Sequence, residues 1–273
     1  MKLLSWNICI NMDNTDEVIS FLARENPDIV CLQEATRLID PNTSKQYHSA
    51  NDIDAAFKKS HPYSFFAPSF VADKVFKNGQ LYKDYNGKIE QGNHLLSKFP
   101  ITAAASKFYY NDYAHWIDIS DFREKDWARN LLTAHVETPQ NAVRLFNVHG
   151  CVNKTRLGDD RTLHQSEFIL NEVRHEKAPL IIAGDFNLVP ESESIRMIDQ
   201  HFRNLAKENG ITRTRSIGSG KGDLAVDYIF VNDKICVRDF KSSIRKFLTT
   251  CRLFWTLIFA RSNHENIQQT YPR

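Results

Sequence analysis

The sequence predicts an α/β fold, because strand-like and helix-like stretches alternate near the two ends of the chain while strand-rich stretches fill the middle. Apolar runs rich in β-branched residues, at residues 29–32 and 180–183, are typical of core strands covered on both faces. The 273 residues contain no internal repeat and no linker. We therefore expect a single domain over residues 1–240, followed by an atypical tail at 241–273.

The first helix is predicted at residues 15–25. Asn14 is a suitable N-cap, and Asp16 and Glu17 place negative charge in the first turn, where the helix dipole favours it. Apolar side chains recur at helical spacing, and Pro27 lies just beyond the end. Since strand-like runs lie on both sides, the beginning of the chain reads as strand, helix, strand.

Three further helices and one irregular stretch follow from the pattern. Short helical periodicity covers residues 53–58, a longer amphipathic pattern covers 162–176, and Ser192 is a suitable N-cap for a helix over 192–202. Residues 70–92 combine glycines with lysines, which predicts a loop or hairpin. The glycine-rich residues 218–222 lack the pattern of a phosphate-cradling loop, and we interpret them as a turn.

Composition excludes several classes of protein. A net charge of +2 gives no global basic field, so any phosphate recognition must be local. The five cysteines are scattered without a CxxC pair, so neither a zinc site nor a disulfide framework is indicated. No signal-peptide core and no membrane-spanning run is present. We expect a cytoplasmic monomer with no membrane span.

The most informative segment is the apolar run at 180–183, which delivers Asp185 and Asn187 where the strand ends. Gly184 allows the backbone to stop there. If the chain stays extended, the two polar side chains point to the same side and are able to orient a water and a phosphate oxygen together. The alternative is an ordinary polar turn, in which Asp and Asn are common.

Four other strand-like runs also end on chemically capable side chains. These are Asn7, Glu34, His149 and Asp227. Each has a structural alternative: Asn7 as a strand-end hydrogen bonder, Glu34 as the first residue of a loop, His149 as a core histidine, and Asp227 as a partner of a backbone amide. Five such coincidences in one chain favour a shared functional site.

The ordered motifs "SWNI", "DIVCLQE", "GNHLLSKFPI", "LFNVHG", "GDFN" and "VDYIF" resemble the endonuclease/exonuclease/phosphatase (DNase I-like) superfamily over about residues 1–240. The resemblance implies a four-layer α/β sandwich of two packed, mostly antiparallel sheets flanked by helices. It also implies an enzyme that hydrolyses phosphodiesters or phosphomonoesters. Asn93, at a motif position, would help to order the site, although an ordinary loop amide is an equal reading.

The chemistry assigns a role to each residue, and these roles match those implied by the resemblance. Phosphoester hydrolysis needs a cation on the phosphate, a positioned water and donors for the developing charge. Glu34 is the expected ligand of Mg²⁺, for which Mn²⁺ would substitute, because hard oxygens suit this ion. Asp185 would orient or deprotonate the water. Asn7 and Asn187 would hold phosphate oxygens or the metal's water shell, and His149 would donate toward the phosphate.

The closing motif of the superfamily is not found in its usual form. That motif is Ser-Asp-His, with its His held by the residue that corresponds to Asp227. Only His264 offers a near match, and no apolar strand follows it. Permitted codons from Phe247 onward, read two bases later, encode Ser-Asp-His and an alternating strand. We therefore hypothesise a frameshift in the tail, and expect the final core strand to be missing.

Two functional readings remain open. One is a Mg²⁺-dependent phosphoesterase, either nuclease or phosphatase, with nucleic acid among its candidate substrates. The other is a catalytically impaired member that binds a phosphorylated partner or nucleic acid. The near-neutral charge disfavours a tight duplex binder.

Overall fold

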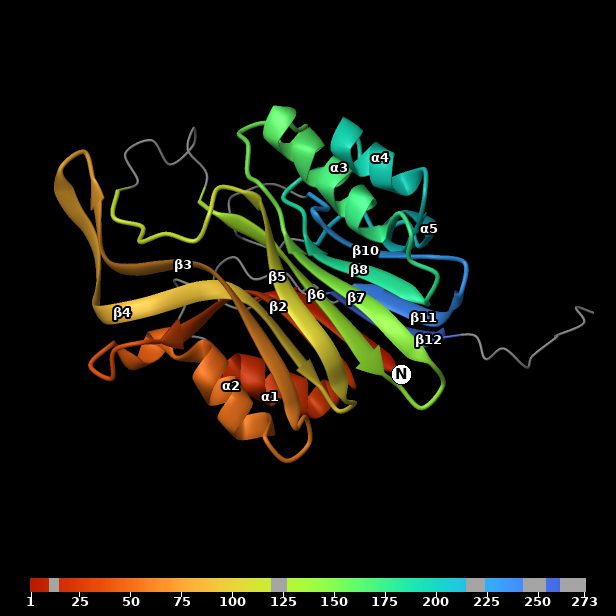
Figure 1. The fold of residues 1–273 in the computed structure, drawn as a ribbon, viewed down its shortest axis with the longest axis horizontal. Coiled ribbons are helices and arrows are strands. Elements are labelled where there is room, and N and C mark those ends of the chain that lie inside the picture. Colours follow the sequence, from red (N-terminus) through yellow and green to blue (C-terminus); the bar gives the residue numbers. More distant parts are fainter. Residues whose placement is uncertain (10–14, 119–126, 215–223, 243–253, 261–273) are drawn as a thin grey trace, which may run out of the picture.

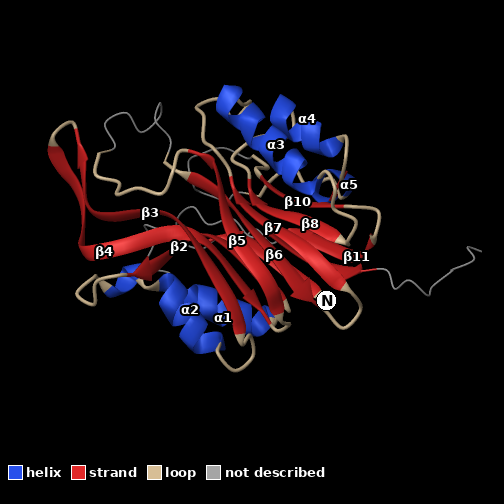
Figure 2. Ribbon diagram, in the orientation of Figure 1, coloured by secondary structure: helices blue, strands red, loops and turns tan. Residues whose placement is uncertain are grey.

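The computed structural model is a sandwich of two six-stranded sheets with helices on the outer faces (Figures 1 and 2). It describes residues 1–9, 15–118, 127–214, 224–242 and 254–260. Sheet 1 has the order β11-β12-β1-β2-β4-β3, and sheet 2 has the order β5-β6-β7-β8-β10-β9. The predicted four-layer α/β sandwich is confirmed.

Sheet 1 is covered by the helices of the first quarter of the chain. Its strands are β1 (Lys2–Asn7), β2 (Ile29–Leu38), β3 (Tyr63–Lys77), β4 (Gln80–Ser97), β11 (Ile235–Ser242) and β12 (Phe254–Ala260). The covering elements are α1 (Thr15–Glu25), the short 3₁₀ helix η1 (Lys45–Tyr47) and α2 (Ser49–Phe57). Only β1 and β2 pair in parallel within this sheet.

Sheet 2 is covered by helices from the second half. Its strands are β5 (Ile101–Tyr110), β6 (Arg129–Glu137), β7 (Ala142–His149), β8 (Leu180–Asp185), β9 (Arg203–Asn204) and β10 (Asp227–Val231). The helices are α3 (Asp160–Val173), α4 (Glu193–Asp199) and α5 (Leu205–Glu208). Here β7 and β8 are the parallel pair. None of the described helices is long and apolar enough to cross a membrane.

The main core lies between the sheets and continues beneath α3 and α4. Alternate residues of β1 and β2 face opposite ways: Leu3 and Cys31 belong to this core, whereas Leu4 and Val30 pack under α1 and α2. All six residues of β8 are buried, as expected for a strand that is covered on both faces.

The helix predictions are confirmed with shifted boundaries. α1 covers the predicted residues. α3 begins at Asp160 because Asp159 caps it, with its side chain accepting hydrogen bonds from the backbone N–H groups of Arg161 and Thr162. Ser192 caps α4 as predicted, since its Oγ accepts from Ile195 N at 3.3 Å.

Residues 70–92 form a hairpin rather than a loop. β3 and β4 pair along their length and turn at Asn78 and Gly79, whose φ angles are 50° and 74°. Two consecutive residues at positive φ are the signature of a tight hairpin turn, for which Asn-Gly is the preferred pair. In Figure 1 this hairpin extends well beyond the rest of sheet 1.

The end of the chain differs from expectation. The expectation that the final core strand is missing is wrong, because β12 pairs antiparallel with both β1 and β11. The apolar run of the tail is able to form this strand, since β-propensity and backbone pairing need no particular motif. The frameshift hypothesis stays a prediction. Residues 218–222 and His264 lie outside the described residues.

Candidate active site

Three predicted site residues lie side by side on neighbouring strands of sheet 2. His149 at the end of β7 is paired with Asp185 at the end of β8. Asp185 is in turn paired with Asp227, the first residue of β10. Residues that are paired directly across a sheet project from the same face, so the strand register alone forms a row of three polar side chains.

Asn7 connects this row to sheet 1. Its Nδ2 donates hydrogen bonds to Asp185 Oδ2 and to Glu34 Oε1, both at 2.9 Å. Its Oδ1 accepts from the backbone N–H of Cys9 at 3.0 Å, which fixes the amide plane. One neutral amide therefore lies between two carboxylates from different sheets, and partly offsets their mutual repulsion.

Glu34 does not end its strand, contrary to the sequence prediction. β2 continues to Leu38, and the pairing with β4 is interrupted between Leu32 and Ala35. Glu34 sits in this bulge at φ 58°, an unusual conformation for a non-glycine residue. The bulge turns the carboxylate toward His149, whose Nε2 lies 3.6 Å from Glu34 Oε1. Bulges commonly aim a side chain in this way.

The segment after β8 is a turn, and the prediction of an extended chain through Asn187 is wrong. Asn187 has φ 59°, and its backbone N–H donates to Asp185 Oδ1 at 2.9 Å. The side chain consequently points elsewhere: Nδ2 donates to the Gly150 carbonyl at 3.1 Å, and Oδ1 accepts from Arg156 Nη1 at 2.6 Å. The local Asp-to-backbone bond explains why the turn forms.

Gly184 has a role that the sequence did not reveal. It remains within β8 at φ 150°, and a Cβ added there would lie 2.0 Å from the Val148 carbonyl oxygen. The residue therefore allows β7 and β8 to approach closely just before their ends, where His149 and Asp185 lie.

Asp227 is held by a residue that sequence reasoning missed. Thr214 donates its hydroxyl hydrogen bond to Asp227 Oδ2 at 2.5 Å, and its Oγ1 accepts from the backbone N–H groups of Val226 and Asp227. Thr214 precedes the glycine-rich stretch and carries no periodic signal, so only the folded chain identifies it. Next to Asp227, burial and this carboxylate raise the pKa of the Tyr228 phenol.

Asn93 is not brought into contact with the other predicted residues. Its Nδ2 donates to Asn130 Oδ1 at 3.0 Å, inside the sandwich. The register nevertheless places Asn93 across from the β2 bulge, because its neighbours Gly92 and His94 pair with Ala35 and Leu32. An effect of Asn93 on the other site residues would therefore be transmitted through the Glu34 bulge.

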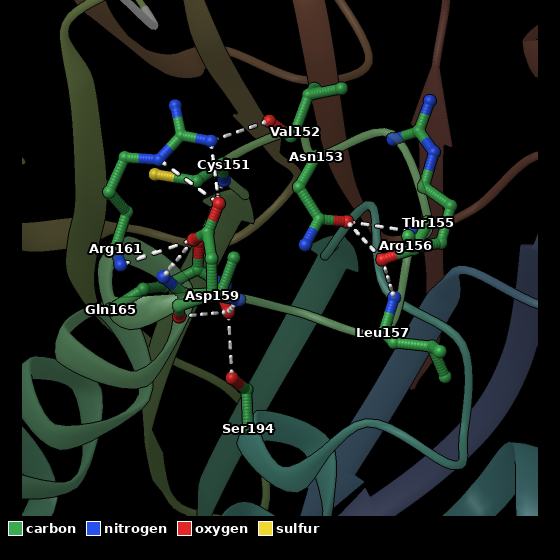
Figure 3. A network of polar contacts seen from close by, with 11 residues as sticks. Cys151, Val152, Asn153, Thr155, Arg156, Leu157, Asp159, Arg161, Gln165 and Ser194 are labelled. Atoms are coloured by element: carbon green, nitrogen blue, oxygen red, sulfur yellow. Dashed lines mark hydrogen bonds and ion pairs between the residues drawn. The ribbon is translucent and has the colours of Figure 1, made fainter. Parts of the chain in front are cut away.

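The loop after β7 places Arg156 against Asn187. Figure 3 shows the polar network that holds this loop. Asn153 Oδ1 accepts from Arg156 N at 2.6 Å, and Arg161 Nη2 donates to the Val152 carbonyl at 3.3 Å. At the base of the loop, Cys151 N donates to Gln165 Oε1 at 2.7 Å. Arg156 was missed in the sequence because nothing distinguishes it from other loop cations.

The donors at the site suit a magnesium ion. The described residues contain no cluster of three or more His, Cys, Asp or Glu side chains. Mg²⁺ usually retains several waters and needs only one or two carboxylates. Glu34, the most exposed member with 19% of its side chain accessible, fits that requirement. His149, Asp185, Asn187 and Asp227 are buried.

The fold of the chain is shared with several solved structures. The chain superposes on an endonuclease/exonuclease/phosphatase from Beutenbergia cavernae with a TM-score of 0.73 at 17% identity, covering 95% of this chain and 71% of that one. A humanized TDP2 of D. rerio (TM-score 0.65, 16% identity, coverage 95% and 99%) and a mannosyl-6-phosphatase of Bacteroides thetaiotaomicron (0.63, 14%, 95% and 99%) share the fold.

At these identities the likeness concerns the fold alone, and no curated protein sequence matches the chain. Family membership rests on the sequence model of the Endonuclease/Exonuclease/phosphatase family, which matches residues 4–246. That match includes all seven predicted site residues and every strand except β12, apart from the first two residues of β1. The chain therefore belongs to the Endonuclease/Exonuclease/phosphatase family, whose members hydrolyse phosphoester bonds.

Proposed function

We propose that this protein is a Mg²⁺-dependent phosphoesterase in which water attacks a phosphodiester or phosphomonoester. The observation that carries the proposal is the Asn7 amide, which lies 2.9 Å from the carboxylates of both Glu34 and Asp185. With His149 3.6 Å from Glu34, the two sheets converge on a single group of polar side chains at their strand ends. Family membership supports the reaction class.

Glu34 would hold the magnesium ion, which supplies charge stabilisation to the phosphate oxygens when bound. Asp185 would accept the proton of the attacking water as general base. Two N–H donors, from Asn7 and the Asn187 backbone, orient its carboxylate. A base held by two hydrogen bonds is fixed in direction, which is the requirement for general base catalysis.

His149 would donate a hydrogen bond to the phosphate or the leaving oxygen. The Tyr109 hydroxyl donates to the His149 carbonyl at 2.7 Å and so fixes the end of β7. Asn7 would hold a phosphate oxygen or a metal-bound water near Glu34. Asn187 would have the same role, and the hydrogen bond from Arg156 orients its amide.

The test is hydrolysis of two chromogenic substrates, bis(4-nitrophenyl) phosphate and 4-nitrophenyl phosphate, with Mg²⁺, with Mn²⁺ and with EDTA. We expect turnover with either ion and its loss in EDTA. Turnover that persists in EDTA rejects metal dependence. Calorimetric Mg²⁺ binding without turnover of either substrate, or of single- and double-stranded DNA, favours the catalytically impaired alternative.

A further inference from the structure

Asn147 belongs to sheet 2, but its side chain forms hydrogen bonds to sheet 1 beside the break in the pairing of β2 and β4. The last regular pair of β2 and β4 before the Glu34 bulge is Leu32 with His94. The Asn147 side chain reaches across the sandwich to this pair, donating to the Leu32 carbonyl at 2.9 Å and to the His94 carbonyl at 3.4 Å. One carboxamide thus binds both strands at the point where their ladder breaks.

Gln33 completes the contact from the other side. Its Nε2 donates to Asn147 Oδ1 at 2.7 Å and to Ser5 Oγ at 3.2 Å. Both Gln33 and Asn147 are fully buried. Gln33 immediately precedes Glu34, and Asn147 lies two residues before His149 on the same face of β7. The pair therefore connects the bulge that carries Glu34 to the strand that carries His149.

We infer that Asn147 is a positioning residue, which locks the β2 bulge and thereby holds the Glu34 carboxylate opposite His149 and Asp185. The inference rests on the proposed function, in that Glu34 is taken as the metal ligand. A bulge residue at φ 58° persists only when its surroundings hold it in place. The hydrogen bonds of Asn147 supply that restraint at the two carbonyls of the pair that immediately precedes the interruption.

A purely structural role predicts a different outcome from a positioning role. Removing one partner of a buried hydrogen bond lowers the stability of the fold wherever the bond lies in the core. A positioning residue must also change the behaviour of the group it positions. Outer partners of metal ligands typically change metal affinity or activity by about 10–100-fold when they are replaced. Metal affinity therefore separates the two roles.

The experiment compares Asn147→Leu with Leu145→Ala. Leu has the same number and branching of side-chain heavy atoms as Asn and removes every hydrogen bond of the side chain. Leu145 is fully buried and lies on β7 two residues before Asn147, on the same face of the strand. It forms no hydrogen bond with the bulge or with Gln33. Leu145→Ala is expected to lower the melting temperature at least as much, through the cavity it creates.

We expect Asn147→Leu to weaken Mg²⁺ binding by about tenfold or more in calorimetry and to lower kcat with little change in KM. For Leu145→Ala, the Mg²⁺ affinity and kcat should both stay within about twofold of the parent values. Gln33→Leu should weaken Mg²⁺ binding as well, and the double variant should lose less than the sum of the two changes, since both act on one contact. Unchanged Mg²⁺ affinity in a folded Asn147→Leu variant overturns the inference.

A second readout does not depend on metal. Hydrogen exchange of the backbone amides at residues 33–36 should rise in Asn147→Leu and not in Leu145→Ala; equal protection in all proteins also overturns the inference. If Asn147→Leu does not fold, the experiment uses Asn147→Thr instead, whose hydroxyl keeps one hydrogen-bond donor. Should the parent itself bind no Mg²⁺, the proposed function fails, while the exchange experiment still decides whether Asn147 locks the bulge.

Discussion

His149 Nε2 lies 3.6 Å from Glu34 Oε1, although the two residues come from different sheets and are far apart in sequence. The contact exists because Glu34 sits in a bulge of β2 and His149 ends β7. It makes the site a property of the interface between the sheets, so changes on either sheet should affect metal binding and catalysis.

Replacing Glu34 with Gln should abolish Mg²⁺ binding with little loss of fold. A site built on few carboxylates cannot lose its anionic ligand and keep a hard dication. Isothermal calorimetry checks the binding, and thermal unfolding checks the fold. Glu137→Gln, at an exposed position on the end of β6, is the matched control. Unchanged Mg²⁺ affinity in Glu34→Gln would rule out this residue as the ligand.

Asp185→Asn should lower kcat by about 10²–10⁴-fold while substrate affinity stays near that of the parent, because a general base acts mainly in the transition state. The new amide would also face the Asn7 Nδ2 donor. Steady-state kinetics on a chromogenic phosphodiester measure the effect, with Asp233→Asn, outside the site, as the control. Turnover close to the parent value contradicts the assigned role.

Gly184→Ala should destabilise the protein by at least about 2 kcal/mol, since the new methyl would collide with the Val148 carbonyl oxygen at 2.0 Å and φ 150° is unfavourable for alanine. Gly79→Ala serves as the control: it has φ 74° but no atom within 4 Å of the added Cβ, so only backbone strain, about 1 kcal/mol, remains. Urea unfolding compares the two. An equal cost for both would show that β7 and β8 do not need the glycine.

Acid should weaken the fold through His61. Burial lowers the pKa of this imidazole below 6.5, and Lys98 acts in the same direction. The hydrogen bond to the Pro27 carbonyl and the charge of Asp28 oppose this shift of the pKa. The neutral ring is held between the Pro27 carbonyl, at 2.8 Å from Nε2, and the Ser60 hydroxyl, at 3.0 Å from Nδ1.

Because the unfolded chain takes up this proton more readily, the stabilisation is complete above about pH 6.5 and is lost as the pH falls through the lower folded-state value. Urea unfolding at pH 7.5 and 5 should show a smaller drop for His61→Gln than for the parent. The same drop in both proteins would exclude His61 as the source.

Restoring the shifted reading frame from about residue 246 should raise the rate by about a hundredfold, the usual effect of a positioned acid-base or oxyanion group. No large gain in stability is expected, because β12 already lies between β1 and β11. Full Mg²⁺-dependent activity of the present chain that disappears in His264→Ala would contradict the hypothesis, as would genomic confirmation of the present frame.

The sequence by itself determined the fold class and most of the site. Asn7, Glu34, His149, Asp185 and Asp227 were identified because each is a polar side chain within or beside a short apolar run, and strand ends in a layered α/β fold meet at common edges. Their local signals are complete within a few residues, so no knowledge of distant partners was needed to find them.

Only the tertiary structure decided how these residues meet. The bulge at Glu34 depends on pairing with β4, and the direction of the Asn187 amide depends on its hydrogen bonds with Gly150 and Arg156. Asn147 shows the limit most clearly: its position before His149 marks it as facing the core, but its role comes from carbonyls on another sheet. The periodicity of a sequence indicates only which face of its own strand a residue occupies. It therefore cannot predict contacts between residues that are more than a hundred positions apart.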